Sequence, residues 1–305
     1  MNIFETITGK IDKIVLIFAV VVLTASFYFV YTLSHSYAQK ETVHSLENAL
    51  LLTRNMLDEE QQHALSLSLL LSEDKTFLEA FYGDDRKKTF EIIREKLASL
   101  KKLQGYTFEV QVHDKNLHTF LRSWDFSIKG VPLASFREGL VLVKERKKPL
   151  VSIEVGKRLN IKAISPILKQ GKFQGSIEVI EGFAHLREKL SEQGYALFIL
   201  LDKEYLSVAT TLTKHPLLEN RFVLVNTHYD KNSYESLKNA TLDQLGSYGY
   251  FTHSGYVFGY FDIRNFHGKR LGYFVIALQK SAPVALKARY ESDVSAQNES
   301  EVIIR

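Results

Sequence analysis

The stretch Leu150-Val-Ser-Ile-Glu-Val-Gly-Lys-Arg-Leu-Asn-Ile-Lys-Ala-Ile164 alternates apolar and polar side chains on both sides of a short glycine-containing turn. Because successive side chains of a strand point to opposite faces, this period of two predicts strands over 150–155 and 159–164. A third strand is expected over 175–180. One face of the three strands is apolar, and the other carries Ser152, Glu154, Arg158, Asn160, Lys162, Ser176 and Glu178.

The polar face of this predicted sheet has two interpretations. The apolar face needs a cover, and the helices predicted elsewhere in the chain are the available cover. The opposite face is either wet, as on many antiparallel sheets, or it lies beneath the segment 121–140 and lines a pocket for a small polar ligand. The sequence leaves both interpretations open.

Helical periodicity dominates the chain before the sheet. Apolar residues from Thr42 to about Leu71 recur mainly at spacings of three, four and seven, which predicts an amphipathic helix. Gly83-Asp84-Asp85 predicts a break followed by a new helix with an aspartate N-cap. Shorter helices are expected over 132–147 and 184–191.

A run of twenty residues near the N-terminus, Ile14 to Leu33, carries no charge. As a helix it would span roughly 30 Å, the thickness of the hydrocarbon core of a bilayer. A signal peptide normally has an apolar core of about 7–15 residues followed by small residues, whereas this run is longer and ends in bulky ones. It is therefore interpreted as an uncleaved membrane anchor. Lys10 and Lys13 lie close to its N-terminal end, and because positive residues favour the cytoplasmic side, they favour an N-terminus inside the cell and a large domain outside the membrane.

The composition is that of an ordinary folded domain. Hydrophobic residues make up 45% of the 305 residues and charged residues 24%, and there is no cysteine. A net charge of +4, scattered along the chain, does not indicate a nucleic-acid partner. The absence of cysteine is compatible with an exported domain but also with other compartments.

A second set of strand signals follows the first. It begins over 196–201 and ends over 256–262 and 271–278. Gly171-Lys-Phe-Gln-Gly175 precedes the last strand of the first set, and Gly268-Lys-Arg-Leu-Gly272 precedes the last strand of the second. Such a hairpin needs one residue that tolerates positive φ and an unhindered strand start. The shared pattern predicts two related α/β sensory modules in tandem.

The segment 121–140, which precedes the strand predicted over 150–155, contains an aromatic and basic group of candidate ligand-binding residues. Trp124, the only tryptophan, lies between Arg122 and Arg137, and Asp125 follows it. A tryptophan wall beside an arginine fork can hold a small carboxylate, because the ring excludes water and the guanidinium bonds in bidentate fashion. The alternative is that Trp124 fills the core while Arg122 pairs with Asp125 on the surface.

Signals for catalysis are weak. The sequence contains no nucleophile-elbow, phosphate-loop or dinucleotide-binding motif. His113 and His118 flank a turn that includes Asp114, so a metal site there is conceivable, but histidines at a hairpin are more often surface residues. We therefore expect no enzyme activity, no cofactor and no metal.

Several ordered blocks resemble the double Cache sensor domains of bacterial receptors. They are Phe120-Leu-Arg-Ser-Trp-Asp125, Phe136-Arg-Glu-Gly-Leu140, Ile153-Glu-Val-Gly156, Ile161-Lys-Ala-Ile-Ser-Pro-Ile167 and Gly171-Lys-Phe-Gln-Gly-Ser-Ile-Glu178. The resemblance implies a periplasmic ligand-binding region in which one long helix braces two PAS-like modules. It also implies that the first, membrane-distal module holds the ligand, with Arg122, Trp124, Arg137 and Glu154 as candidates. Such domains occur in chemoreceptors, sensor histidine kinases and diguanylate cyclases.

The expected fold class is α+β, with an N-terminal transmembrane helix, a long bracing helix and two PAS-like antiparallel-sheet modules. The expected division is a cytoplasmic N-terminus (1–13), the transmembrane helix (14–33), a long helical region (34–104), a membrane-distal module (105–183), a membrane-proximal module (184–280) and a polar C-terminal tail (281–305).

The sequence thus predicts a single-pass inner-membrane protein whose C-terminal domain senses a small polar ligand in the periplasm. The ligand is expected to be a carboxylate or an amino acid. Receptors of this type usually return through a second membrane helix to an output module, and the chain shows neither, so either it acts through a separate output protein or it is a shortened receptor. A parallel homodimer along helix 42–71 is expected. The alternative is a tethered interaction module without ligand sensing. The predicted ligand-binding residues are Arg122, Trp124, Asp125, Arg137, Glu154, Arg158, Lys162 and Glu178.

Overall fold

The computed structural model describes residues 3–243 and 245–280. Its contacts separate residues up to Ser45 from a compact unit that extends from Leu46 to Gln279. The expected α+β class is confirmed, with an apolar N-terminal helix and two antiparallel sheets. The predicted polar tail, 281–305, lies outside the described residues.

The first helix, α1 (Ile3–Glu73), contains the apolar run. Within it, Val15–Ser34 has a mean hydropathy of 2.2 and is long and apolar enough to cross a membrane. The hydroxyl of Thr24 donates to the carbonyl oxygens of Val20 and Val21 at 2.9 Å, which satisfies this polar group within the helix.

From Leu46 onward α1 presents one apolar stripe to the core. Leu46, Leu50, Leu57, Ala64 and Leu71 are buried at spacings of four and seven, as the sequence predicted.

Two shorter helices follow, α2 (Lys75–Tyr82) and α3 (Arg86–Gln104). The predicted aspartate cap is confirmed, because Asp85 accepts a hydrogen bond from the backbone N–H of Lys88 at 3.0 Å.

The first sheet is fully antiparallel and has the order β2-β1-β5-β4-β3. Its strands are β1 (Glu109–Asp114), β2 (Thr119–Arg122), β3 (Leu150–Val155), β4 (Leu159–Lys169) and β5 (Lys172–Glu181).

The helix expected over 132–147 is shorter than predicted, since α4 covers only Glu138–Arg146. Pro132 instead bridges to His118 in an extended conformation. Arg137 is the N-cap, and Lys147 ends the helix in the left-handed conformation.

The second sheet has the order β7-β8-β6-β11-β10-β9. Its strands are β6 (Ala196–Asp202), β7 (Leu217–Leu218), β8 (Phe222–Leu224), β9 (Tyr248–His253), β10 (Tyr256–Arg264) and β11 (Arg270–Gln279). The helix α5 (Ala184–Glu192) connects the two sheets. Two 3-10 helices cover Lys203–Ser207 and Thr210–Leu212, and the helix α6 (Lys231–Lys238) packs against the second sheet.

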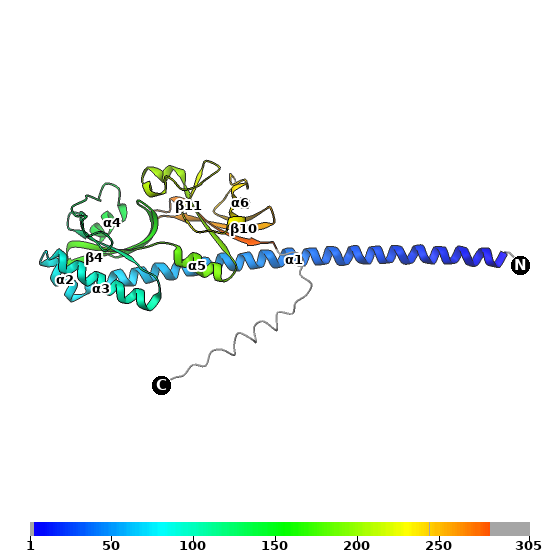
Figure 1. Ribbon diagram of the computed structural model, residues 1–305, viewed down its shortest axis with the longest axis horizontal. Helices are drawn as coiled ribbons and strands as arrows, with labels where there is room; N and C mark the ends of the chain where they lie inside the picture. The colour runs from blue at the N-terminus through cyan, green and yellow to red at the C-terminus, as the bar shows by residue number, and fades with distance from the viewer. Residues whose placement is uncertain (1–2, 244, 281–305) are drawn as a thin grey trace, which may run out of the picture. The chain divides into compact units, whose positions relative to one another are not determined.

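Both sheets lie between helices. The portion of α1 after Ser45 packs on one face of each, and α4 and α6 lie on the opposite faces, as Figure 1 shows. In each sheet the first strand pairs with the last, and the last also pairs with the strand before it. The two sheets therefore share a topology, which agrees with the tandem arrangement inferred from the repeated glycine pattern.

The repeated glycines perform the same two tasks in each sheet. Gly171 and Gly268 have φ values of 70° and 75° in the hairpin turns before the last strands. A Cβ atom on Gly175 would lie 2.2 Å from the backbone oxygen of His113, and one on Gly272 would lie 1.9 Å from that of Leu200. Only glycine lets the last strand pair so closely with the first.

We expect Gly175→Ala and Gly272→Ala each to lower the free energy of unfolding by about 1–3 kcal/mol, because the added methyl group must push two strands apart. Denaturation of the full chain followed by circular dichroism measures the change. Gly246→Ala is the matched control, since its Cβ would meet no atom within 4 Å. Equal stability of all three variants would contradict the close-approach explanation.

Candidate functional site

The polar face of the first sheet is buried, so the interpretation of a wet face is wrong. Six of the seven predicted polar-face residues are at most 8% exposed: Ser152, Glu154, Asn160, Lys162, Ser176 and Glu178. Arg137, at the start of α4, lies over this face and is 5% exposed. A buried concentration of charge of this kind must be internally paired, because isolated ions are costly to remove from water.

Arg137 and Glu178 form the central ion pair. The guanidinium donates two hydrogen bonds to the carboxylate, one of them from Nη1 to Oε2 at 3.3 Å. Glu154 is the second acid, with its Oε2 3.7 Å from Nη2 of Arg137, and it accepts a hydrogen bond from Ser152 at 2.9 Å. Burial opposes the charges of Arg137 and Glu178, but each partner outweighs that cost, raising the pKa of Arg137 and lowering the pKa of Glu178.

The local sequence explains how Arg137 reaches the sheet. It occupies the N-cap of α4, and the next turn of the helix lies directly on Glu154. A Cβ atom on Gly139 would lie 2.3 Å from Oε1 of Glu154. Glycine at this position therefore allows the helix to approach the carboxylate closely.

Lys162 and Arg122 add two further positive groups. Burial, together with repulsion from Arg137, lowers the pKa of Lys162 to about 8, although Glu178 and Glu154 oppose that shift. Arg122 lies at the edge of the cluster, where its Nε donates to the side chain of Gln111 at 3.1 Å. Burial also lowers the pKa of Arg122.

His113 belongs to the same cluster, which the sequence did not predict. Its Nδ1 lies 3.0 Å from the hydroxyl of Ser176, and its Nε2 lies 3.7 Å from Glu178. Burial lowers its pKa to about 4, against the opposing influence of Glu178. The sequence contains a pattern that could have identified this position. Gln111 and His113 alternate with buried valines on β1, and they pair with Glu178 and Ser176 of β5.

Three predicted residues lie outside the buried cluster. Trp124 is 43% exposed and stacks with the guanidinium of Arg122 at 5.6 Å, so it does not fill the core. Asp125 accepts hydrogen bonds from the backbone and hydroxyl of Ser127. Arg158 is half exposed and pairs with Glu109. The structure thus brings together Arg122, Arg137, Glu154, Lys162 and Glu178, and leaves these three at the periphery.

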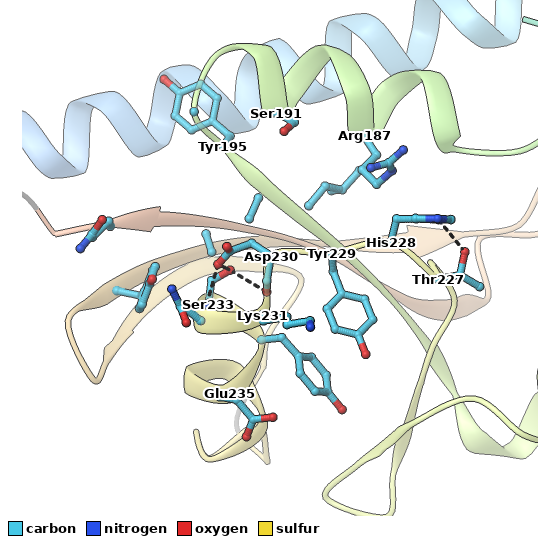
Figure 2. Close-up of a pocket in the computed structure, with 18 residues that line it drawn as sticks. Arg187, Ser191, Tyr195, Thr227, His228, Tyr229, Asp230, Lys231, Ser233 and Glu235 are labelled. Atoms are coloured by element: carbon cyan, nitrogen blue, oxygen red, sulfur yellow. Dashed lines mark hydrogen bonds between the residues drawn. The ribbon is translucent and has the colours of Figure 1, made fainter.

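A cavity of about 1050 Å³ lies in the second module, at the start of β6 and of α6. Figure 2 shows Tyr229 and Lys231 close together, with Arg187 of α5 above them in the view. Asp230 is the N-cap of α6, and its Oδ2 accepts hydrogen bonds from the backbone N–H and the hydroxyl of Ser233 at 2.7 Å. The cavity is polar but lacks a buried ion-pair cluster like that of the first module among its described lining residues.

Comparison with protein families matches residues 39–282 to the double sensory domain of two-component sensor kinases. The chain belongs to the double Cache family. The match covers both sheets and the part of α1 that packs against them. It confirms the resemblance seen in the sequence, and it establishes the chain as a sensor domain of the signal-transduction type, a family that is typically non-catalytic.

Several solved structures align with this double Cache chain. They include a domain of a putative sensory box/GGDEF family protein from Vibrio parahaemolyticus, at 13% identity and a TM-score of 0.48, with 79% of this chain and 97% of that chain covered. The sensor domain of the V. cholerae histidine kinase DctB is 12% identical, with a TM-score of 0.44, and the alignment covers 77% of this chain and 96% of that chain. The ligand-binding domain of the Campylobacter jejuni chemoreceptor Tlp3 in complex with L-valine is 12% identical, with a TM-score of 0.47, and the alignment covers 80% of this chain and 95% of that chain. The comparison with curated proteins gives no match.

We expect the buried neutral His113 to lower stability in acid. Its pKa is about 4 in the folded chain and near 6.5 when unfolded, so below pH 6.5 the unfolded state binds a proton that the folded state excludes. His113→Gln removes this loss, and the stability gap between wild type and variant should narrow by about 2 kcal/mol from pH 7 to pH 4.5. Denaturation at both pH values measures it. His118→Gln, at the neighbouring turn, is the control, and a gap that stays constant with pH would contradict the assignment.

Proposed function

We propose that this double Cache domain senses a small carboxylate-bearing metabolite, a carboxylic acid or an amino acid, at the buried cluster of the first module. The observation that carries the proposal is the grouping of three basic side chains in and beside that cluster. Arg137 and Lys162 lie with Glu154 and Glu178 in its buried part, and Arg122 is a partly buried third base at its edge, near the surface acid Asp125. A small carboxylate could pair with these bases in a site that is shielded from water.

Unpartnered polar atoms support this location. Nε of Arg137 and Nε2 of His113 are buried without a hydrogen-bond partner among the described residues. A bound carboxylate could accept from both groups, which would recover the cost of leaving buried donors unpaired. Glu154 would then be available to accept from the ammonium group of an amino acid.

The matching positions of the second module favour the first module as the binding site. Aligning the two close-approach glycines places Ser176 and Glu178 opposite Tyr273 and Val275 in the second sheet. Tyr273 and Val275 are fully buried in an aromatic and aliphatic core. The second module thus uses for packing the face that the first module fills with charges.

The signal would arise from competition for Arg137. In the described state its guanidinium is bonded to Glu178, so an incoming carboxylate must replace or share that partner. Because Arg137 caps α4 and Glu178 lies on β5, the exchange would shift a helix against the sheet. A ligand that binds one of these two arrangements more tightly changes their populations, which is the thermodynamic basis of sensing.

We further propose that Val15–Ser34 anchors the domain in the inner membrane, with the two modules, 105–183 and 184–280, in the periplasm. The length and hydropathy of the span support this topology. The proposed homodimer would pair α1 helices, on which Leu51 and Leu70 are exposed hydrophobic residues.

The central test is a thermal-shift screen of the full chain against organic acids and amino acids. We expect a stabilising carboxylate, and we expect Lys162→Met and Arg122→Gln each to weaken it by about tenfold or more, since each removes a charge from the cluster. Arg158→Gln is the matched control and should change the affinity less than about twofold, because Arg158 lies at the surface with Glu109. A ligand that binds all three variants equally would contradict the site.

The membrane anchor has its own test. We expect the full chain to stay with the membrane fraction during alkaline extraction, and a chain with Val22→Asp and Val30→Asp in the span to be released, because charges are costly in the bilayer core. Release of the wild-type chain would contradict the proposed anchor without affecting the ligand site.

A further inference from the structure

A second group of buried acids lies on the opposite face of the first sheet, beside α1. Glu60 of α1 is 6% exposed, and Glu181, the last residue of β5, is 3% exposed. Oε2 of Glu60 and both carboxyl oxygens of Glu181 have no hydrogen-bond partner among the described residues. Buried polar atoms are normally satisfied, so three unpaired acceptors in one place need an explanation.

The missing component at this site is a positive charge. Burial and, second, the charge of the neighbouring Glu181 together raise the pKa of Glu60 to about 8, and burial raises the pKa of Glu181 to about 8 as well. His185 of α5 contacts Glu60 at 3.1 Å, but burial and then Lys189 lower its pKa, so at neutral pH it supplies no charge. An ionised pair would therefore be uncompensated.

A cavity of about 530 Å³ gives access to Glu60 from solvent. Its lining includes Met56, His63 and Tyr106, and Tyr106 stacks on His185 with the ring centres 4.4 Å apart. The hydroxyl of Tyr106 lies 3.3 Å from Nδ1 of His63. Carboxyl groups beside aromatic faces form a suitable environment for an organic cation.

The charged groups around the cavity favour the same ligand charge. On α1, Asp58 and Glu59 also line it. On α5, Glu188 and Glu192 lie near His185, and Lys189 is paired with Glu192 at 3.3 Å. Gln104 at the end of α3 and Tyr106 just after it contribute uncharged polar groups. Acidic groups therefore dominate the approach to Glu60.

We propose that this cavity binds a small primary amine, whose ammonium group binds the lining residue Glu60 and reaches past it to Glu181, which does not itself line the cavity, and whose apolar part packs against Tyr106 and Met56. The three N–H donors of an ammonium group match the three unpaired carboxyl oxygens. Among the described residues no cluster of three or more histidine or acidic side chains is arranged to hold a metal ion, so an amine fits the site better than a metal.

The position of the cavity gives the amine a regulatory role. Glu60 belongs to the long helix, Glu181 ends the first sheet, and His185 belongs to α5, which leads into the second sheet. An ammonium held by these groups would fix α1 against the connection between the two modules. This role does not depend on the carboxylate site.

The test is thermal shift of the full chain in lipid nanodiscs, with butylamine as the probe and 1-butanol, which lacks the charge and is not a carboxylate, as the control of the same shape. At about five times its Kd, butylamine should raise Tm by about 2–4 °C, and 1-butanol at the same concentration should not. The apparent Kd should tighten about tenfold per pH unit as the pH rises toward 8, because binding an ammonium displaces a proton from the carboxyl pair. This pH dependence is measured on the wild-type chain and needs no variant.

Glu60→Gln and Glu181→Gln should abolish the amine response, and the matched control Glu188→Gln, on the exposed side of α5, should keep it. Circular dichroism checks that each variant is folded.

A response that persists in both glutamine variants overturns the site. Stabilisation by acid alone, without any effect of butylamine, overturns the amine and identifies a proton-sensing pair. Stabilisation by zinc chloride but not by butylamine overturns it in favour of a metal.

Discussion

The buried ion pair between Arg137 and Glu178 is the interaction on which the first module depends. Two charges at a fully buried position cost more in lost hydration than apolar residues of the same volume would. The chain keeps them by adding Glu154, Lys162 and His113 around the pair, and by placing a glycine where α4 crosses Glu154. A face built for stability alone would resemble the second module, where the matching positions hold tyrosine and valine.

The portion of α1 after Ser45 links the two modules. Its Ser68 forms a buried hydrogen bond of 2.8 Å with Ser165 of the first sheet. Earlier on the same helix, Leu46 and Leu50 pack against Gly259 of the second sheet so closely that a Cβ atom there would lie within 3.0 Å of either side chain. A small shift of the first sheet against this helix would therefore be felt at a tightly packed contact in the second.

Local patterns in the sequence predicted most of the fold. The alternation over 150–164 and the spacing of the leucines in α1 identify the correct strands and helix face, because both periods follow from backbone geometry. The extent of α4 was wrong, since Arg137 acts as a cap and Pro132 pairs with His118. His113 was missed because its role depends on the pairing of β1 with β5, and the acid pair Glu60–Glu181 was missed because its members are 121 positions apart in the chain.

The strand β5 connects the two proposed sites physically. Glu178 and Glu181 are three residues apart, and in a strand an odd separation places side chains on opposite faces. One acid thus belongs to the cluster beneath α4 and the other to the cavity beside α1. If a carboxylate at the first site moves β5, it changes the geometry of the acid pair, and thermodynamic linkage then requires an amine at the second site to change carboxylate affinity by the same factor. A strand of ten residues could in this way combine two chemically opposite signals before they reach the helix.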